Sequence, residues 1–72
     1  MRAIEPDMVL GKQAIASGGE RLGEIVDVGL YTHDRVKFLV VQRGGPGAVP
    51  IRRVEVGEIT QVSADSVRLS VA

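Results

Sequence analysis

Five basic side chains between residues 35 and 53 have the clearest potential for binding chemistry. They are Arg35, Lys37, Arg43, Arg52 and Arg53. Guanidinium groups donate paired hydrogen bonds to phosphate or carboxylate oxygens, so side chains of this kind on neighbouring strands could bind RNA or an acidic protein. The same charges also keep an apolar strand from pairing with other chains, and this is the more common role. RNA recognition further favours exposed aromatic rings, and the chain offers only Tyr31 and Phe38.

The sequence offers only weak candidates for a metal site or a phosphate-binding site. His33 is the only histidine and the chain has no cysteine, whereas a metal site needs several converging ligands. We expect His33 to be a loop residue, and we expect no metal or cofactor. The run Gly44-Gly45-Pro46-Gly47 lacks the Lys-Ser/Thr pair and the following helix of a phosphate-binding loop, which predicts a simple turn.

The sequence also lacks a convincing set of catalytic residues. The serines have no general base nearby in the sequence; they are Ser17, Ser63, Ser66 and Ser70. The acidic stretch Glu20, Glu24 and Asp27 could supply paired carboxylates for acid/base work, but charges on a strand more often form its exposed edge. The sequence therefore predicts a protein that is not an enzyme.

Length and composition predict one small domain. The chain has 72 residues, with nine basic and nine acidic side chains and a formal net charge of zero. Without an overall field of either sign, nucleic acid or anionic membrane would have to bind a local patch. A domain this small buries a marginal core, so we expect self-association, most simply a homodimer.

The N-terminal eight residues combine charge with Pro6, which does not fit a signal peptide. No apolar run reaches the length of about 20 residues that spans a bilayer. We therefore expect a cytoplasmic protein without membrane insertion.

Short Val- and Ile-rich segments separated by glycines predict an all-β fold. Gly18-Gly19 predicts a tight turn between a strand near residues 12–17 and a long strand over 21–32, in which Gly23 and Gly29 indicate bulges. Residues 35–42 form the most strand-like window, and Val49-Pro50-Ile51 predicts a short edge strand. Residues 52–57 fit an extended segment better than one helical turn, and Ile59–Val62 with Val67–Val71 predict a closing hairpin.

These elements predict a small antiparallel β-barrel of five to six strands, or two packed sheets, over residues 9–72. Residues 1–8 are expected to form an N-terminal arm.

The order and spacing of five motifs resemble the PRC-barrel family. The motifs are Val9-Leu10-Gly11-Lys12-Gln13-Ala14-Ile15, Gly19–Asp27, Lys37–Val41, Val49-Pro50-Ile51, and the terminal pair Ile59–Val62 with Val67-Arg68-Leu69. The resemblance implies a compact barrel that acts as an adaptor without catalysis, as in the photosynthetic reaction-centre H subunit, a ribosome-maturation factor and stand-alone archaeal and bacterial proteins, some tied to cell division. We expect neither the membrane anchor of the first nor the preceding domain of the second, so neither role is expected to carry over directly.

Two functional hypotheses follow from these observations. The first is an adaptor that self-associates and binds another protein, with an apolar N-terminal approach that includes Ile4. Its candidate self-association residues are Met8, Val9, Leu10, Val54 and Val56. The second is an RNA- or ribosome-associated module that binds through Arg43, Arg52 and Arg53. A small-molecule sensor at the barrel mouth would need a cavity, which we expect side chains to fill.

Overall fold

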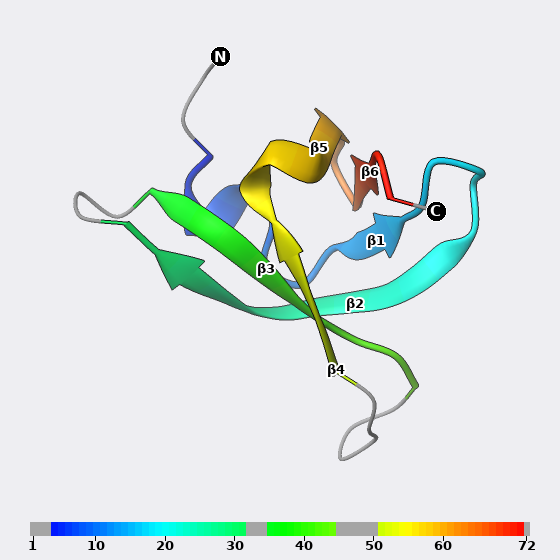
Figure 1. Cartoon of the computed structure of the whole chain (residues 1–72), viewed down its shortest axis with the longest axis horizontal. Helices are drawn as coiled ribbons and strands as arrows, with labels where there is room; N and C mark the ends of the chain where they lie inside the picture. Colours follow the sequence, from blue (N-terminus) through cyan, green and yellow to red (C-terminus); the bar gives the residue numbers. More distant parts are fainter. Residues whose placement is uncertain (1–3, 32–34, 45–50, 72) are drawn as a thin grey trace.

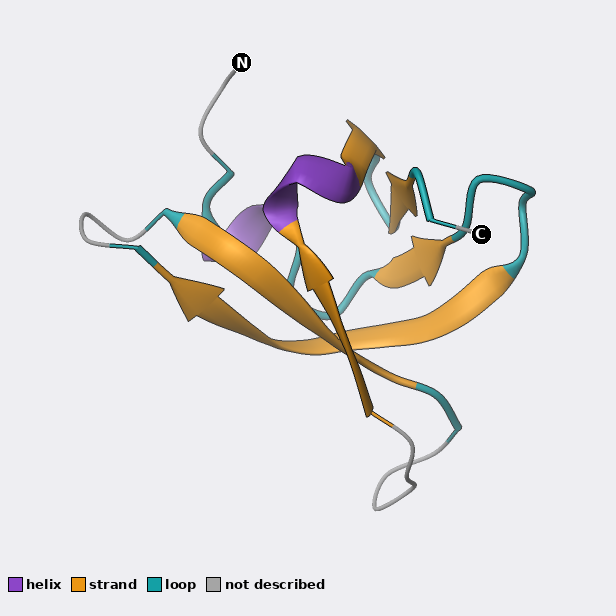
Figure 2. Ribbon diagram, viewed as in Figure 1, coloured by secondary structure: helices purple, strands orange, loops and turns teal. Residues whose placement is uncertain are grey.

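The structure is a computed structural model that describes residues 4–31, 35–44 and 51–71. The described residues form six strands and short 3₁₀ helices (Figures 1 and 2). In chain order they are η1 (Pro6–Met8), β1 (Gln13–Ile15), β2 (Arg21–Leu30), β3 (Val36–Gln42), β4 (Ile51–Glu55), η3 (Val56–Glu58), β5 (Ile59–Val62) and β6 (Ser66–Leu69). The predicted all-β class is confirmed.

All six strands belong to one curled sheet in the order β4-β3-β2-β1-β6-β5. Neighbours are antiparallel except β1 and β6, which are parallel. The sheet is not closed, because its edge strands β4 and β5 are joined by η3 and not by ladder hydrogen bonds. It differs in both respects from the expected closed antiparallel barrel, since side-chain alternation reveals neither strand direction nor sheet closure.

The long strand β2 joins the two halves of the sheet. Its first residues pair with β1 and its later residues pair with β3. The register shifts beside Gly23, where a bulge was predicted, and again at Val26. It also shifts beside Gly29, but the extra residue there is Lys37 of β3, so that bulge lies on the partner strand and not on β2 as predicted. A Cβ atom at Gly23 would collide with the backbone carbonyl of Gln42, so only glycine fits this close approach.

The core lies inside the curl and is aliphatic. Its buried side chains are Val9, Ala14, Ala16, Ile25, Val36, Leu39, Val41, Val54, Val67 and Leu69. They come from β1, β2, β3, β4, β6 and the segments beside β1, so both halves of the sheet contribute to one core. The Cα radius of gyration, 11.2 Å, matches the value of about 11 Å for a compact chain of this length.

The described part of the expected N-terminal arm packs on the sheet. The Val36 N–H donates to the Ile4 carbonyl oxygen at 2.8 Å, which fixes the segment beside the start of β3. Pro6 begins η1, where its lack of an N–H is tolerated, and Ile4 and Met8 pack against the core. The arm from Ile4 onward is therefore part of the folded unit, while residues 1–3 lie outside the described residues.

The connection between the edge strands is where the local prediction was partly wrong. Residues 52–55 are extended, as predicted, but Val56–Glu58 turn into η3. The alternation of Val54 and Val56 suggested a continuous strand. The 3₁₀ turn instead redirects the chain into β5, and Ser70 secures it by donating its N–H to the Glu58 carbonyl oxygen at 2.7 Å and its hydroxyl to the Glu58 carboxylate.

Candidate functional site

An apolar groove lies between the N-terminal segment, η3 and β5. It has a volume of about 420 Å³, and none of the side chains that line it is charged. They are Ile4, Met8, Val56, Ile59, Thr60, Gln61 and Val62. The apolar members are half-buried, so they support the core on one side and present surface to a ligand on the other.

Local structure explains why these side chains converge. The hydrogen bond from Val36 holds Ile4, and η1 turns Met8 back toward the sheet. On the other side, η3 presents Val56 and delivers the chain directly into β5. Two parts of the chain that are distant in the sequence, the N-terminal segment and the continuous run of η3 and β5, thus build one uncharged surface.

All four residues of β5 line this groove. Among the residues that the structure describes, β5 pairs in the sheet only with β6. Thr60 forms a bulge in that pairing and donates its hydroxyl to the Arg68 carbonyl oxygen at 3.2 Å. The groove therefore combines apolar side chains with the unpaired side of a strand, which is an arrangement that binds extended chains.

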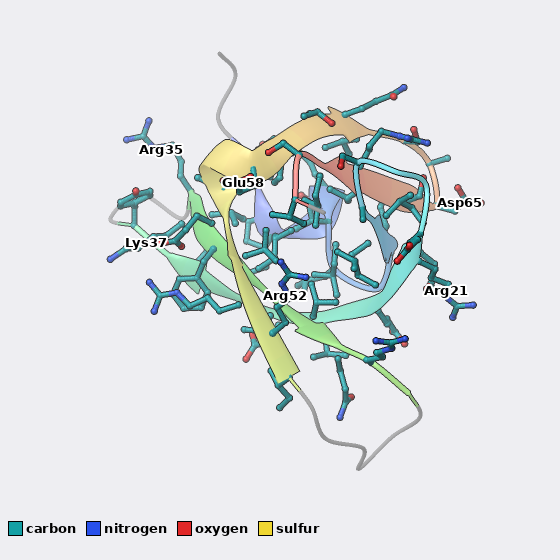
Figure 3. The ribbon with its side chains drawn as sticks, turned by 45° about the vertical axis from the view of Figure 1, so that its right-hand side comes forward. Arg21, Arg35, Lys37, Arg52, Glu58 and Asp65 are labelled. Atoms are coloured by element: carbon teal, nitrogen blue, oxygen red, sulfur yellow. The ribbon has the colours of Figure 1, made fainter. Side chains whose placement is uncertain are left out.

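The predicted basic patch is divided among separate places. Arg35 and Lys37 lie together near the start of β3, whereas Arg43 follows its end, a separation of about 20 Å at the rise of an extended strand. Figure 3 shows Arg35 and Lys37 at one margin of the molecule and Arg52 apart from them. All five basic side chains are exposed, but they do not converge on one site.

Arg52 and Arg53 point to opposite faces of the sheet. Arg52 pairs with the buried Val41 and so lies on the inner side, beyond the core, while Arg53 pairs with Val40 on the outer side. The Arg53 guanidinium stacks over the Phe38 ring at 4.1 Å from its centroid and forms a 3.4 Å ion pair with Glu55. Arg53 therefore has a structural function on its own sheet.

Phe38 is the centre of this outer arrangement. Its ring lies over Gly29 on β2, where a Cβ atom would overlap the ring, and Arg53 on β4 covers it. Gly29, Phe38 and Arg53 thus form a stack across three neighbouring strands, which we call the outer stack. Nearby, the Lys37 ammonium lies 5.7 Å from the centroid of Tyr31, a ring that is half exposed.

The five candidate self-association residues divide into three environments. Val9 and Val54 are buried in the core of a single chain, so a second copy cannot contact them without rearrangement. Met8 and Val56 line the groove, and Leu10 is exposed outside it. Sequence reasoning missed the β5 contribution, Ile59–Val62, although the absence of charge from this strand was a usable signal.

The remaining candidates do not assemble into a site. The three acidic residues Glu20, Glu24 and Asp27 are exposed, as expected for the solvent-facing edge of a strand. In the described parts of the chain no group of three or more His, Cys, Asp or Glu residues could hold a metal ion, and no helix is long and apolar enough to cross a membrane. His33 and Gly45-Pro46-Gly47 lie outside the described residues.

A second hollow of about 280 Å³ lies where β2 passes the end of β3. It is lined by Arg21, Leu22, Gly23, Glu24, Gln42, Arg43 and Gly44. Arg21 there donates to the Gln13 amide oxygen at 2.6 Å, and the carboxylate of Glu24 offsets part of the positive charge. This hollow is smaller than the groove and contains charges of both signs, which makes it the weaker candidate for a binding site.

Comparison with known proteins gave no relative: no family model, no curated protein and no solved structure matches this chain.

Proposed function

We propose that this chain is a non-enzymatic adaptor that self-associates as a homodimer and presents a composite surface to another protein. The observation that carries the proposal is the uncharged groove beside β5. Half-buried apolar side chains gain free energy when a partner removes them from water, at about 25 cal/mol per Å². A small domain with an aliphatic core gains stability from such a contact as well.

The finer assignment within this proposal is a stand-alone PRC-barrel-like protein of the cytoplasm. It rests on the order of the sequence motifs, and the curled all-β sheet is compatible with it. Stand-alone members of that family suggest a partner in archaeal-type cell division. We include this partner class in the proposal as the first to test for binding.

Light scattering coupled to size-exclusion chromatography tests self-association across micromolar concentrations. We expect a dimer for the natural sequence and a shift toward monomer for Met8→Gln, which makes the groove polar. Leu10→Gln is the matched control, because Leu10 is a nearby apolar residue that is 42% exposed and lies outside the groove. A folded monomer throughout this range would contradict the proposal, and equal behaviour of the two variants would place self-association elsewhere.

RNA binding is the second candidate function. The observation that favours it is the half-exposed Tyr31 ring beside Lys37, because a base could stack there next to a cation. It predicts binding of single-stranded RNA that weakens steeply with salt and is lost in Tyr31→Ala plus Lys37→Glu. Arg52→Glu is the control, since Arg52 lies apart from this pair. Salt-independent or absent binding would exclude this function.

A further inference from the structure

Strand β5 lacks most of the features that protect an edge strand. Its sequence, Ile59-Thr60-Gln61-Val62, contains no charge, proline or glycine. Exposed edges normally carry charged residues or proline, because an unprotected row of backbone groups pairs with other chains. The Thr60 bulge lies at the start of β5 beside η3, and the register with β6 is regular from Gln61 to Val62. The end of β5 therefore remains a template for a further strand.

The direction of the backbone groups can be deduced from the turn after β5. The Ser63 N–H donates to the Ser66 carbonyl oxygen at 2.8 Å, across the turn to β6. Successive residues of an antiparallel strand direct their backbone groups to alternate sides. The N–H and C=O of Val62 therefore point away from β6, and Val62 is itself one of the residues that line the groove.

We propose that the occupant of the groove is β5 of a second copy, paired antiparallel with β5 of the first across a two-fold axis. This inference rests on the self-association proposed above and specifies its geometry. A two-fold interface places the same surface on both copies, so that surface must be complementary to itself. β5 meets this condition, because it brings unpaired backbone groups and no charge that would oppose its own copy.

A second copy fits the groove better than a flexible peptide would. Its β5 is already ordered by β6, whereas a disordered peptide must lose conformational entropy when it binds. A stable dimer buries about 800 Å² per copy, which is about one sixth of the 4671 Å² surface of this chain. The strand alone is too short for this area, and Ile4, Met8 and Val56 extend the contact on the groove side.

A pair of opposite charge substitutions at Gln61 tests the geometry. Gln61 is exposed, and in a four-residue strand it lies close to any two-fold axis through the middle of β5. We expect Gln61→Lys and Gln61→Glu each to weaken the homodimer by roughly 100-fold, because like charges then face each other across the axis. An equimolar mixture of the two variants should restore a dimer, because the charges become opposite.

Ser17→Lys and Ser17→Glu provide matched controls, since Ser17 is an exposed turn residue away from β5. Circular dichroism of every variant establishes that it is folded. A second measurement needs no substitution: exchange of the Val62 amide hydrogen in the natural protein should slow with rising concentration. The Ser63 amide, already bonded within the chain, should change much less.

The outcomes separate this inference from the proposed function. A natural protein that is monomeric at all concentrations would overturn both. The β5 pairing would be overturned if both Gln61 variants remained dimeric, or if exchange of the Val62 amide did not depend on protein concentration. Either result would still be compatible with self-association through another surface. Disrupted homodimers without a mixed dimer would contradict the two-fold arrangement.

Discussion

The two edge strands of the sheet are protected to very different degrees. Three of the five residues of β4 are charged, namely Arg52, Arg53 and Glu55, whereas none of the four residues of β5 is. The outer stack holds β4 to its neighbours, while β5 has only β6 as a neighbour in the sheet among the described residues. Side-chain charge thus separates an edge that resists pairing from one that permits it.

The comparison also changes the interpretation of the arginines. In the sequence, Arg52 and Arg53 were candidates for one anion-binding patch. In the structure they lie on opposite faces of a protected edge, and Arg53 covers Phe38. Their arrangement agrees better with edge protection and packing than with recognition of a ligand.

Removing two of the three charges of β4, and leaving Arg53 over Phe38, should produce the largest change. We expect Arg52→Thr combined with Glu55→Thr, which leaves the net charge unchanged, to open the second edge. Chains with two open edges can link end to end, so the mean mass in light scattering should rise at least roughly twofold over the dimer. Adding Gln61→Lys should limit the assemblies to dimers. A double variant that keeps the mass of the natural protein would show that these charges do not protect β4.

Gly29→Ala should have the next largest effect, by disturbing the outer stack. The new methyl group would overlap the Phe38 ring and force it away from Arg53. We expect the free energy of unfolding, measured with urea, to fall by about 2 kcal/mol. Gly18→Ala is the control, because no atom lies within 4 Å of its Cβ position and its φ is not positive. It should leave stability unchanged or raise it by up to about 1 kcal/mol. Equal losses in both variants would contradict the role of the stack.

Local features of the fold could be predicted because nearby residues determine them. Gly18-Gly19 marked the β1–β2 turn, Gly23 marked a bulge of β2, Gly29 marked a register shift, and the final hairpin followed from alternating side chains. Strand order, the parallel β1–β6 pair and the open sheet depend on contacts between distant segments. The groove escaped prediction for the same reason, since Ile4 and Val62 meet only after folding.

The Arg53 side chain should contribute more to the free energy of unfolding than the side chain of Arg52. Arg53→Ala removes the cation and the aliphatic stem that cover Phe38, so we expect a loss of about 1 kcal/mol in the free energy of unfolding. Arg52→Ala should cost less than about 0.5 kcal/mol, as for most exposed positions. The Glu55 ion pair adds little, because both of its side chains are more than half exposed. A larger loss for Arg52 than for Arg53 would reverse the assignment of the two faces.

Thr60→Val is the smallest change, and it isolates the effect of charge on the β5 edge. It removes the exposed hydroxyl bond to the Arg68 carbonyl oxygen but keeps a β-branched side chain that suits a strand. We expect the free energy of unfolding to fall by no more than about 0.5 kcal/mol, since water can replace this bond. The dimer should persist, whereas Thr60→Lys at the same position should weaken it. If sedimentation shows that valine disrupts the dimer as strongly as lysine does, then the shape of the bulge, and not the absence of charge, controls pairing at β5.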